Sequence, residues 1–392
     1  MNHDPFGAEI SRHVWDSKYR WREPGGAARD ARVEDTWRRV ARALASVEKD
    51  APHWEQRFYS ILEGFRFLPG GRILAGAGTG HRVTLFNCFV MGTIEDTLDS
   101  IFDSLKEGAL TMQQGGGIGV DFSTLRPSGA PALSVGVTAS GPVSFMHIWD
   151  SMCATILSTG SRRGAMMATL RCDHPDIEDF IRIKHDPLRL RHFNLSVLVT
   201  DAFMQAVRDD AEWPLVFPLG SREVTGAENT VERMWSGSVA LVRCRVHRTL
   251  QARALWNDIM RATYDYAEPG VIFIDRVNAL NNLNYIENIS ATNPCGELPL
   301  PPYGACDLGS INLTQFVRAP FSAQAQLDLD AIAETAAIAT RFLDNVTDLS
   351  RFPLERQAEA ARRTRRVGLG LTGLGDALIM LGLRYDTAEA TR

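Results

Sequence analysis

The chain has 392 residues, of which 45% are hydrophobic and 23% are charged, as is typical of a globular protein with two or three domains. A net charge of −5 excludes a bulk attraction to nucleic acid or to an anionic membrane, so any nucleotide must be bound by local sites. No apolar run reaches the ~20 residues of a membrane span, and six cysteines without a Cys-x-x-Cys pair indicate a reduced, cytoplasmic protein.

The N-terminal part of the chain is predicted to form a small helical domain. Residues 1–35 are polar. From residue 33 to residue 65 the apolar side chains recur at helical spacing, with Trp37, Val40, Leu44 and Val47 on one face. We expect this domain to end at Pro69-Gly70-Gly71, where proline and glycine favour a turn.

Short apolar strands and amphipathic helices then alternate, which predicts an α/β fold with a mostly parallel sheet. Residues 219–249 fit this pattern worst, and we interpret them as a surface insertion in which residues 239–246 alternate like a strand. The expected strands are residues 83–92, 195–199 and 271–274, and the expected helices are residues 99–113, 142–157 and 250–266.

Cysteines stand in two motifs that could carry chemistry. Asn293-Pro294-Cys295-Gly296-Glu297 places a thiol between an amide and a carboxylate in a predicted tight turn. Cys306 follows eleven residues later, and Cys88 lies in an apolar segment far away in the sequence. Redox chemistry at a thiol needs a partner thiol and a base. Taken singly, each cysteine is more often a buried packing residue.

Five motifs occur in an order that resembles the large catalytic subunit of ribonucleotide reductase, most closely its adenosylcobalamin-dependent class. They are Phe67-Leu68-Pro69-Gly70-Gly71-Arg72, Thr84-Leu85-Phe86-Asn87-Cys88, Gln113-Gln114-Gly115-Gly116-Gly117-Ile118-Gly119, Gly160-Ser161-Arg162-Arg163-Gly164-Ala165-Met166-Met167 and Asn293-Pro294-Cys295-Gly296-Glu297. The resemblance runs from about Phe67 to the last residues.

The resemblance implies a role for each residue of the cysteine motifs. Cys295 would carry a thiyl radical that abstracts the 3′-hydrogen of a ribonucleotide. Glu297 would take the proton of the 3′-hydroxyl, and Asn293 would form a hydrogen bond with the substrate. Cys88 and Cys306 would supply two reducing equivalents and end as a disulfide. The cofactor implied is adenosylcobalamin, and no protein-bound metal is expected.

The resemblance also implies nucleotide sites and partners. The glycine-rich turn would line the substrate pocket, and Asn87 and Gly117 would contact the substrate through backbone atoms. Residues 99–113 and 142–157 would form a homodimer contact beside a site for a deoxynucleoside triphosphate or ATP effector, and a thioredoxin-like protein would be the reductant. The implied effector residues are Asp96, Arg126, Ser161, Arg162 and Arg163. For the arginine loop, a solvated loop is an equally good interpretation on charge alone.

Two other patterns are poor functional sites. Gly368-Leu369-Gly370-Leu371-Thr372-Gly373 matches a dinucleotide-binding glycine pattern, but a run of arginines and only Val367 precede it. Cys172-Asp173-His174 offers too few ligands for zinc. Cys153 and Cys244 are expected to be structural.

The implied fold is a ten-stranded α/β barrel of two half-barrels, of which this chain would supply the first half and part of the second. We expect a helical domain at residues 1–75, the first half-barrel with the effector and dimer region at 76–290, and the radical-cysteine loop with the start of the second half at 291–392. A C-terminal half would then be a missing partner. Three hypotheses follow: a reductase of ribonucleoside diphosphates active once completed, a non-catalytic nucleotide-binding fragment, and a nicotinamide dehydrogenase built on the Gly368 pattern.

Overall fold

The computed structural model describes residues 5–23, 25–132, 137–156, 164–220 and 229–391. The contacts divide them into two compact units. Unit 1 contains the described residues up to Asn87 and those from Ala305 onward, and unit 2 contains the described residues from Cys88 to Gly304. The domain limits expected from the sequence stay a prediction.

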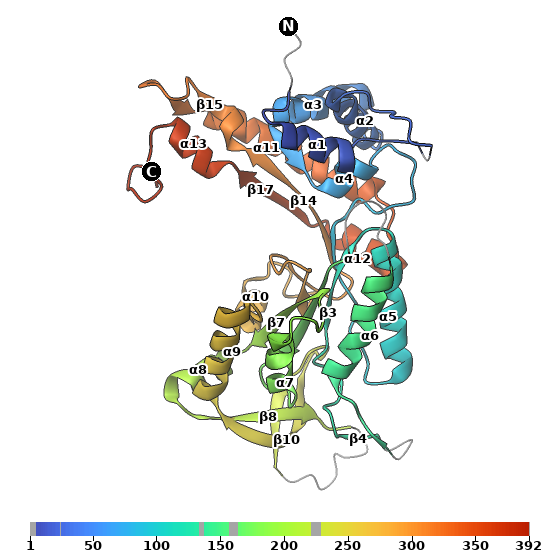
Figure 1. The fold of residues 1–392 in the computed structure, drawn as a ribbon, viewed down its shortest axis with the longest axis vertical. Helices are drawn as coiled ribbons and strands as arrows, with labels where there is room; N and C mark the ends of the chain where they lie inside the picture. Colours follow the sequence, from blue (N-terminus) through green and yellow to red (C-terminus); the bar gives the residue numbers. More distant parts are fainter. Residues whose placement is uncertain (1–4, 24, 133–136, 157–163, 221–228, 392) are drawn as a thin grey trace. The chain divides into compact units, whose positions relative to one another are not determined.

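Unit 1 is mainly helical (Figure 1). In α2 the side chains of Trp37, Val40 and Leu44 share one face and are buried, as their spacing predicts. Val47, which was expected on the same face, is 41% exposed because α2 ends before it, at Ala45. The sequence pattern did not predict α1, which lies in the polar N-terminal segment. The helices of unit 1 are α1 (Glu9–Lys18), α2 (Val33–Ala45), α3 (Ala51–Leu62), α4 (Gly71–Gly76), α11 (Leu329–Leu349), α12 (Glu355–Thr364) and α13 (Leu374–Met380), with the 3₁₀ turns η1 (Glu63–Phe65) and η3 (Leu313–Phe316).

A small sheet completes unit 1. The central strand β14 (Ala305–Asn312) pairs antiparallel with β1 (Phe67–Pro69) and parallel with β17 (Val367–Thr372). Phe342 of α11 packs against Phe58 and Phe67, with ring centroids 5.3 and 5.4 Å apart, so the C-terminal helices share a core with the N-terminal ones. A hairpin of β15 (Val317–Arg318) and β16 (Gln326–Leu327) lies beyond η3.

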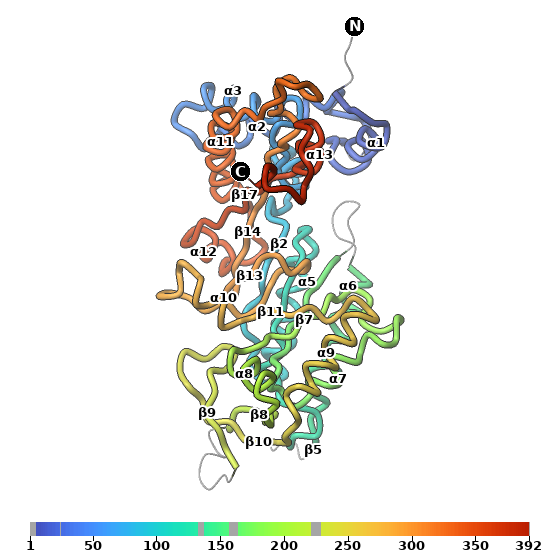
Figure 2. The backbone as a smooth tube through the Cα atoms, turned by 90° about the vertical axis from the view of Figure 1, so that its left-hand side faces the viewer, coloured from blue at the N-terminus to red at the C-terminus, as the bar shows by residue number. Residues whose placement is uncertain are grey.

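Unit 2 is built on a parallel sheet with the strand order β2-β3-β6-β7-β11. Every residue of β6 is buried, which agrees with the apolar character of strands covered on both faces. Figure 2 shows β7 and β11 side by side in this sheet. The strands are β2 (Cys88–Val90), β3 (Gly117–Asp121), β6 (Met166–Arg171), β7 (Phe193–Val199) and β11 (Gly270–Phe273).

Helices connect successive strands of this sheet, as a parallel order requires. Helix α5 packs against α6 and β3, and α9 packs against α7 and α8 (Figure 1). The connections are α5 (Leu98–Gln113), α6 (Pro142–Thr155), α7 (Ile177–Arg182), η2 (Ile183–His185), α8 (Asp201–Asp209) and α9 (Ala252–Tyr266), with α10 (Ile274–Leu280) after β11.

The described residues of the proposed surface insertion contribute two strands to an antiparallel sheet with its own core. Its strand order is β8-β10-β9, and Val216, Trp235 and Cys244 form its buried hydrophobic cluster. The helix expected from residue 250 begins at Ala252, because the preceding two residues pair in β10. The strands are β8 (Glu212–Pro218), β9 (Thr230–Met234) and β10 (Leu241–Gln251); two hairpins, β4 (Pro131–Ala132) with β5 (Val137–Thr138) and β12 (Ala291–Thr292) with β13 (Pro299–Leu300), complete unit 2.

The predicted fold class is confirmed, since a helical N-terminal region precedes an α/β region with a parallel sheet. Within the described part of the chain, no helix combines the length and the apolarity that crossing a bilayer would need.

Candidate active site

The Asn293–Glu297 motif forms the tip of the β12–β13 hairpin in unit 2. Gly296 has a φ of 86°, a left-handed conformation that glycine adopts without strain, and its N–H donates to the Asn293 carbonyl over 3.1 Å. This tight turn leaves the Cys295 and Glu297 side chains exposed. The hairpin therefore presents a thiol and a carboxylate, two residues apart, to the outside of unit 2.

Asn293 connects this turn to the second predicted cysteine. Its side chain is fully buried, and its Nδ2 donates a hydrogen bond of 3.1 Å to Cys88 Sγ. Its Oδ1 accepts a bond of 2.9 Å from the Leu298 N–H. One amide thus holds the two arms of the hairpin together and places the Cys88 sulfur directly beneath them.

Two glycines of the predicted substrate turn let the hairpin approach the sheet. A Cβ at Gly119 would lie 1.7 Å from the Thr292 carbonyl oxygen, and a Cβ at Gly117 would lie 2.7 Å from Pro294 Cγ. Gly117 is also the register partner of Cys88 in the adjacent strand. A larger side chain at either position would clash with the hairpin. The glycines therefore serve to allow close packing of the hairpin on the sheet rather than to make the backbone flexible.

Asn194, near the start of β7, is a member of this site that the sequence did not predict. Its Nδ2 donates to the Pro294 carbonyl over 2.7 Å. The signal available in the sequence was one amide side chain among the apolar and small residues of this strand.

The remaining predicted residues of the cysteine chemistry belong to unit 1. Cys306 is buried on β14, and its Sγ donates to the Asp307 carbonyl over 3.1 Å. The Oδ1 of Asn87 is buried with no hydrogen-bond partner in the described part of the chain, as suits a group that a ligand would satisfy. The pairing of Cys88 with Cys306 stays a prediction.

Two of the predicted effector residues meet at a pocket of about 710 Å³ in unit 2. Arg126 Nε donates to Asp96 Oδ2 over 2.7 Å, and the Arg126 N–H donates to Asp96 Oδ1 over 3.1 Å. Burial raises the pKa of the Asp96 carboxyl, while these bonds from Arg126 oppose the rise. Trp235, Arg245 and His247, from the antiparallel sheet, line the same pocket. Ser161, Arg162 and Arg163 lie outside the described residues.

A buried network extends from this pocket into the parallel sheet. The guanidinium of Arg171 lies 4.7 Å from the Trp235 ring centroid and forms two bonds of 2.8 Å with Asp173. His174 is also buried: its Nε2 lies 2.9 Å from the Leu125 carbonyl, and its Nδ1 accepts the Asp176 N–H over 3.0 Å. Burial lowers the pKa of His174 to about 4. Among the described residues, no group of three or more His, Cys, Asp and Glu could hold a metal ion.

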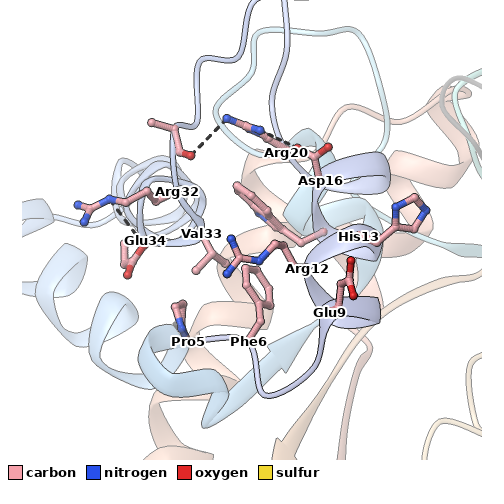
Figure 3. A pocket seen from close by; sticks show the side chains of 12 residues that line it. Pro5, Phe6, Glu9, Arg12, His13, Asp16, Arg20, Arg32, Val33 and Glu34 are labelled. Atoms are coloured by element: carbon pink, nitrogen blue, oxygen red, sulfur yellow. Dashed lines mark hydrogen bonds and ion pairs between the residues drawn. The ribbon is translucent and has the colours of Figure 1, made fainter. Parts of the chain in front are cut away.

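A second pocket, of about 650 Å³, lies between α1 and the start of α2 in unit 1 (Figure 3). Phe6 and Trp15 are among its lining residues, together with several charged side chains. Arg20 pairs with Asp16 at 2.6 Å, and Arg32 lies 4.0 Å from Glu34. Because these acidic and basic side chains pair with one another, the charge of the pocket does not indicate a particular class of ligand.

Of the glycine pattern that begins at Gly368, all but Gly373 lies within β17, which pairs parallel with β14, and Gly373 directly precedes α13. The first two glycines of the pattern therefore sit in a strand and not in a turn that could surround a phosphate, which disfavours a nicotinamide site.

Comparison with known proteins agrees with this geometry. A family model described as "Ribonucleotide reductase, barrel domain" matches residues 86–392, and one described as "Ribonucleotide reductase, all-alpha domain" matches residues 6–82.

Curated relatives are similar along most of the chain. A "Vitamin B12-dependent ribonucleoside-diphosphate reductase" of Mycobacterium tuberculosis is 41% identical over 90% of this chain and 48% of its own length. A protein of the same name from Thermoplasma acidophilum is 36% identical over 92% of this chain and 43% of its own length. A "Ribonucleoside-diphosphate reductase subunit alpha" of Chlamydia muridarum is 28% identical over 90% of this chain and 34% of its own length. The chain thus spans about half, or less, of the length of these relatives.

Proposed function

Because the chain belongs to the ribonucleotide reductase family, we propose that it supplies the radical-cysteine loop of an enzyme that reduces ribonucleoside diphosphates to 2′-deoxyribonucleotides for DNA synthesis. The observation that carries the proposal is the hydrogen bond from Asn293 to Cys88, which joins two of the predicted catalytic motifs next to the exposed Cys295. The names of the relatives support the diphosphate form of the substrate.

The proposed chemistry assigns one role to each residue of the turn. A thiyl radical on Cys295 abstracts the 3′-hydrogen, Glu297 accepts the proton of the 3′-hydroxyl, and the labilised 2′-hydroxyl leaves as water. Cys88 and Cys306 are oxidised to a disulfide as a C2′–H bond replaces the C2′–O bond, and the hydrogen held by Cys295 returns to C3′, which restores the thiyl radical. One ribonucleotide and two thiols thus give one deoxyribonucleotide, one water and one disulfide.

The buried position of Cys88 suits this reducing role. A thiol with 8% exposure is shielded from adventitious oxidants, and its bond with Asn293 keeps the sulfur at the base of the loop. Asn293 Nδ2 would have to share or exchange this bond when it binds a substrate hydroxyl. Asn293 would therefore link substrate arrival to the state of Cys88.

The names of two relatives support adenosylcobalamin as the radical source. The residues present fit this group, because the Cys295 thiol is exposed at a turn that is held in place from the sheet side. When bound, adenosylcobalamin supplies an organic radical through homolysis of its cobalt–carbon bond. The chain's own part is to hold the Cys295 sulfur where a hydrogen atom can leave it.

Regulation and assembly form part of the same proposal. Asp96 and Arg126 would bind the ribose and phosphates of a deoxynucleoside triphosphate or ATP effector, with Ser161, Arg162 and Arg163 passing its identity to the substrate site. Leu98 and Phe102 of α5 are 62% and 50% exposed, which supports a homodimer contact along this helix. A thioredoxin-like dithiol would reduce the Cys88–Cys306 disulfide in the cytoplasm.

Reconstitution tests the proposal. The chain is mixed with a separately produced C-terminal half of a relative, adenosylcobalamin, a dithiol and a ribonucleoside diphosphate, and deoxyribonucleotide is quantified. We expect turnover from the mixture, and none when the chain carries Cys295→Ser, which keeps the side-chain shape but removes the sulfur. If the two halves associate and no product forms, the non-catalytic nucleotide-binding interpretation is favoured instead.

A further inference from the structure

Asn194 differs from the rest of its strand. In β7 the other six residues are apolar or small and are buried, whereas Asn194 is exposed. An exposed amide in an otherwise buried parallel strand contributes little to the core. Its contacts therefore have to explain its presence.

The side chain of Asn194 reaches the radical-cysteine turn. Its Nδ2 donates to the Pro294 carbonyl over 2.7 Å, and the two residues are 100 positions apart in the sequence. That carbonyl belongs to the peptide that joins Pro294 to Cys295. Because a peptide unit is planar, holding its oxygen also limits where the Cys295 nitrogen and Cα can lie.

Within the described part of the chain, the other contacts of the turn involve groups other than this peptide. Asn293 holds the arms through Leu298 and the Gly296 N–H. The glycines of β3 set how closely Thr292 and the Pro294 ring approach the sheet. Asn194 lies on β7, two strands away from β3 in the sheet. Its hydrogen bond restrains the peptide immediately before the cysteine.

We propose that Asn194 is a positioning residue that holds the Pro294–Cys295 peptide, and through it the Cys295 sulfur, in the reacting orientation. The effect on turnover rests on the function proposed above, whereas the effect on the turn does not. Displacement of a reacting group by about 1 Å can lower a rate by about a hundredfold. The consequence should appear in kcat, since Asn194 acts on the enzyme's own thiol and not on substrate binding.

Hydrogen–deuterium exchange of the 392-residue chain tests the positional claim directly. Asn194→Ala should raise the exchange rate of the peptide that spans residues 291–300 by about tenfold, because local opening governs exchange there. Asn194→Asp keeps the side-chain shape but replaces the donor with an oxygen, so it should raise the rate at least as much. Asn257→Ala, at an exposed position of α9, is the matched control and should leave the rate unchanged.

Turnover in the reconstituted mixture gives the second readout. Both Asn194 variants should lower kcat about 10- to 100-fold with KM within about twofold of wild type. Exchange that is unchanged in Asn194→Asp overturns the positioning role, whatever the activity. Faster exchange with no turnover even in the wild-type mixture supports the clamp and counts against the proposed function alone. Faster exchange with an unchanged kcat overturns the inference that the clamp serves the reaction.

Discussion

The side-chain amide of Asn293 donates a 3.1 Å hydrogen bond to the sulfur of Cys88, a residue 205 positions earlier in the chain. Neither residue is at the surface, and both lie beside glycines that let the hairpin pack closely on the sheet. The active-site turn is therefore anchored by polar contacts in addition to shape. Substitution of the residues that form these contacts should therefore alter the turn.

Cys88 and Cys306 should form a disulfide after one turnover without external reductant. The proposed reaction oxidises two thiols for each deoxyribonucleotide formed. Peptide mass mapping of a reconstituted, single-turnover sample measures the linkage. Recovery of both cysteines as thiols, or of a bridge from Cys88 to Cys153, would contradict this pairing.

Gly119→Ala should destabilise unit 2 severely. The added Cβ would lie 1.7 Å from the Thr292 carbonyl, so the hairpin or the strand must move. We expect a loss of more than about 3 kcal/mol in the free energy of unfolding, measured by urea denaturation. Gly375→Ala is the control, because a Cβ at that helical position meets no atom within 4 Å; it should be neutral or stabilising by up to about 1 kcal/mol. A stable Gly119→Ala protein would mean that the close approach is not required.

Asp96→Ala should weaken binding of a deoxynucleoside triphosphate by at least about tenfold, as loss of a charge-assisted hydrogen bond predicts. In the ligand-free chain Asp96 already binds Arg126, so a nucleotide must compete with that ion pair. We also expect the chain alone to bind weakly, because the proposed effector site lies beside the proposed homodimer contact. Calorimetric titration at increasing protein concentration measures both effects. Equal affinity in wild type and Asp96→Ala would remove Asp96 from the site.

His174 should make the protein less stable in mild acid. Its neutral ring donates from Nε2 and accepts at Nδ1, so protonation would point an added N–H at the Asp176 N–H. Since burial lowers its folded-state pKa to about 4, its contribution is complete above the unfolded value of about 6.5 and is lost as the pH falls toward 4. The slope is at most about 1.4 kcal/mol per pH unit.

The test compares His174→Gln with wild type by urea denaturation at pH 7.5 and at pH 5. The glutamine variant should be less stable than wild type at the higher pH, and the difference should shrink at the lower pH. A difference that is constant with pH would show that His174 does not titrate in this range.

Asp307 should have the opposite pH dependence. Both carboxylate oxygens are buried without a hydrogen-bond partner in the described part of the chain. Burial raises its pKa well above the usual range, with a further rise from Asp344 and opposition from Arg365. Stability is therefore greatest below the unfolded pKa of about 3.9 and falls as the pH rises toward the folded value.

Asp307→Asn should consequently stabilise the chain at pH 8 and leave it nearly unchanged at pH 4. Urea denaturation at both values measures this. Loss of stability at pH 8 would indicate that the carboxylate has a partner when charged.

The sequence by itself determined the features that depend on the pattern of neighbouring residues. Apolar spacing identified the α2 face around Trp37 and Leu44, and Pro294 and Gly296 identified a turn at Cys295, because helix periodicity and turn geometry depend on neighbouring residues. It also identified the family, since the motifs are local strings. Only the tertiary structure decided which distant groups meet. The bond from Asn194 to Pro294 and the contact of Gly119 with Thr292 depend on strand order and hairpin placement, which arise from packing over the whole unit. The antiparallel sheet around Trp235 was predicted only in part for the same reason. The alternation over residues 239–246 indicated one strand, but which strands pair with it and which of its faces is buried depend on the packing of the whole sheet.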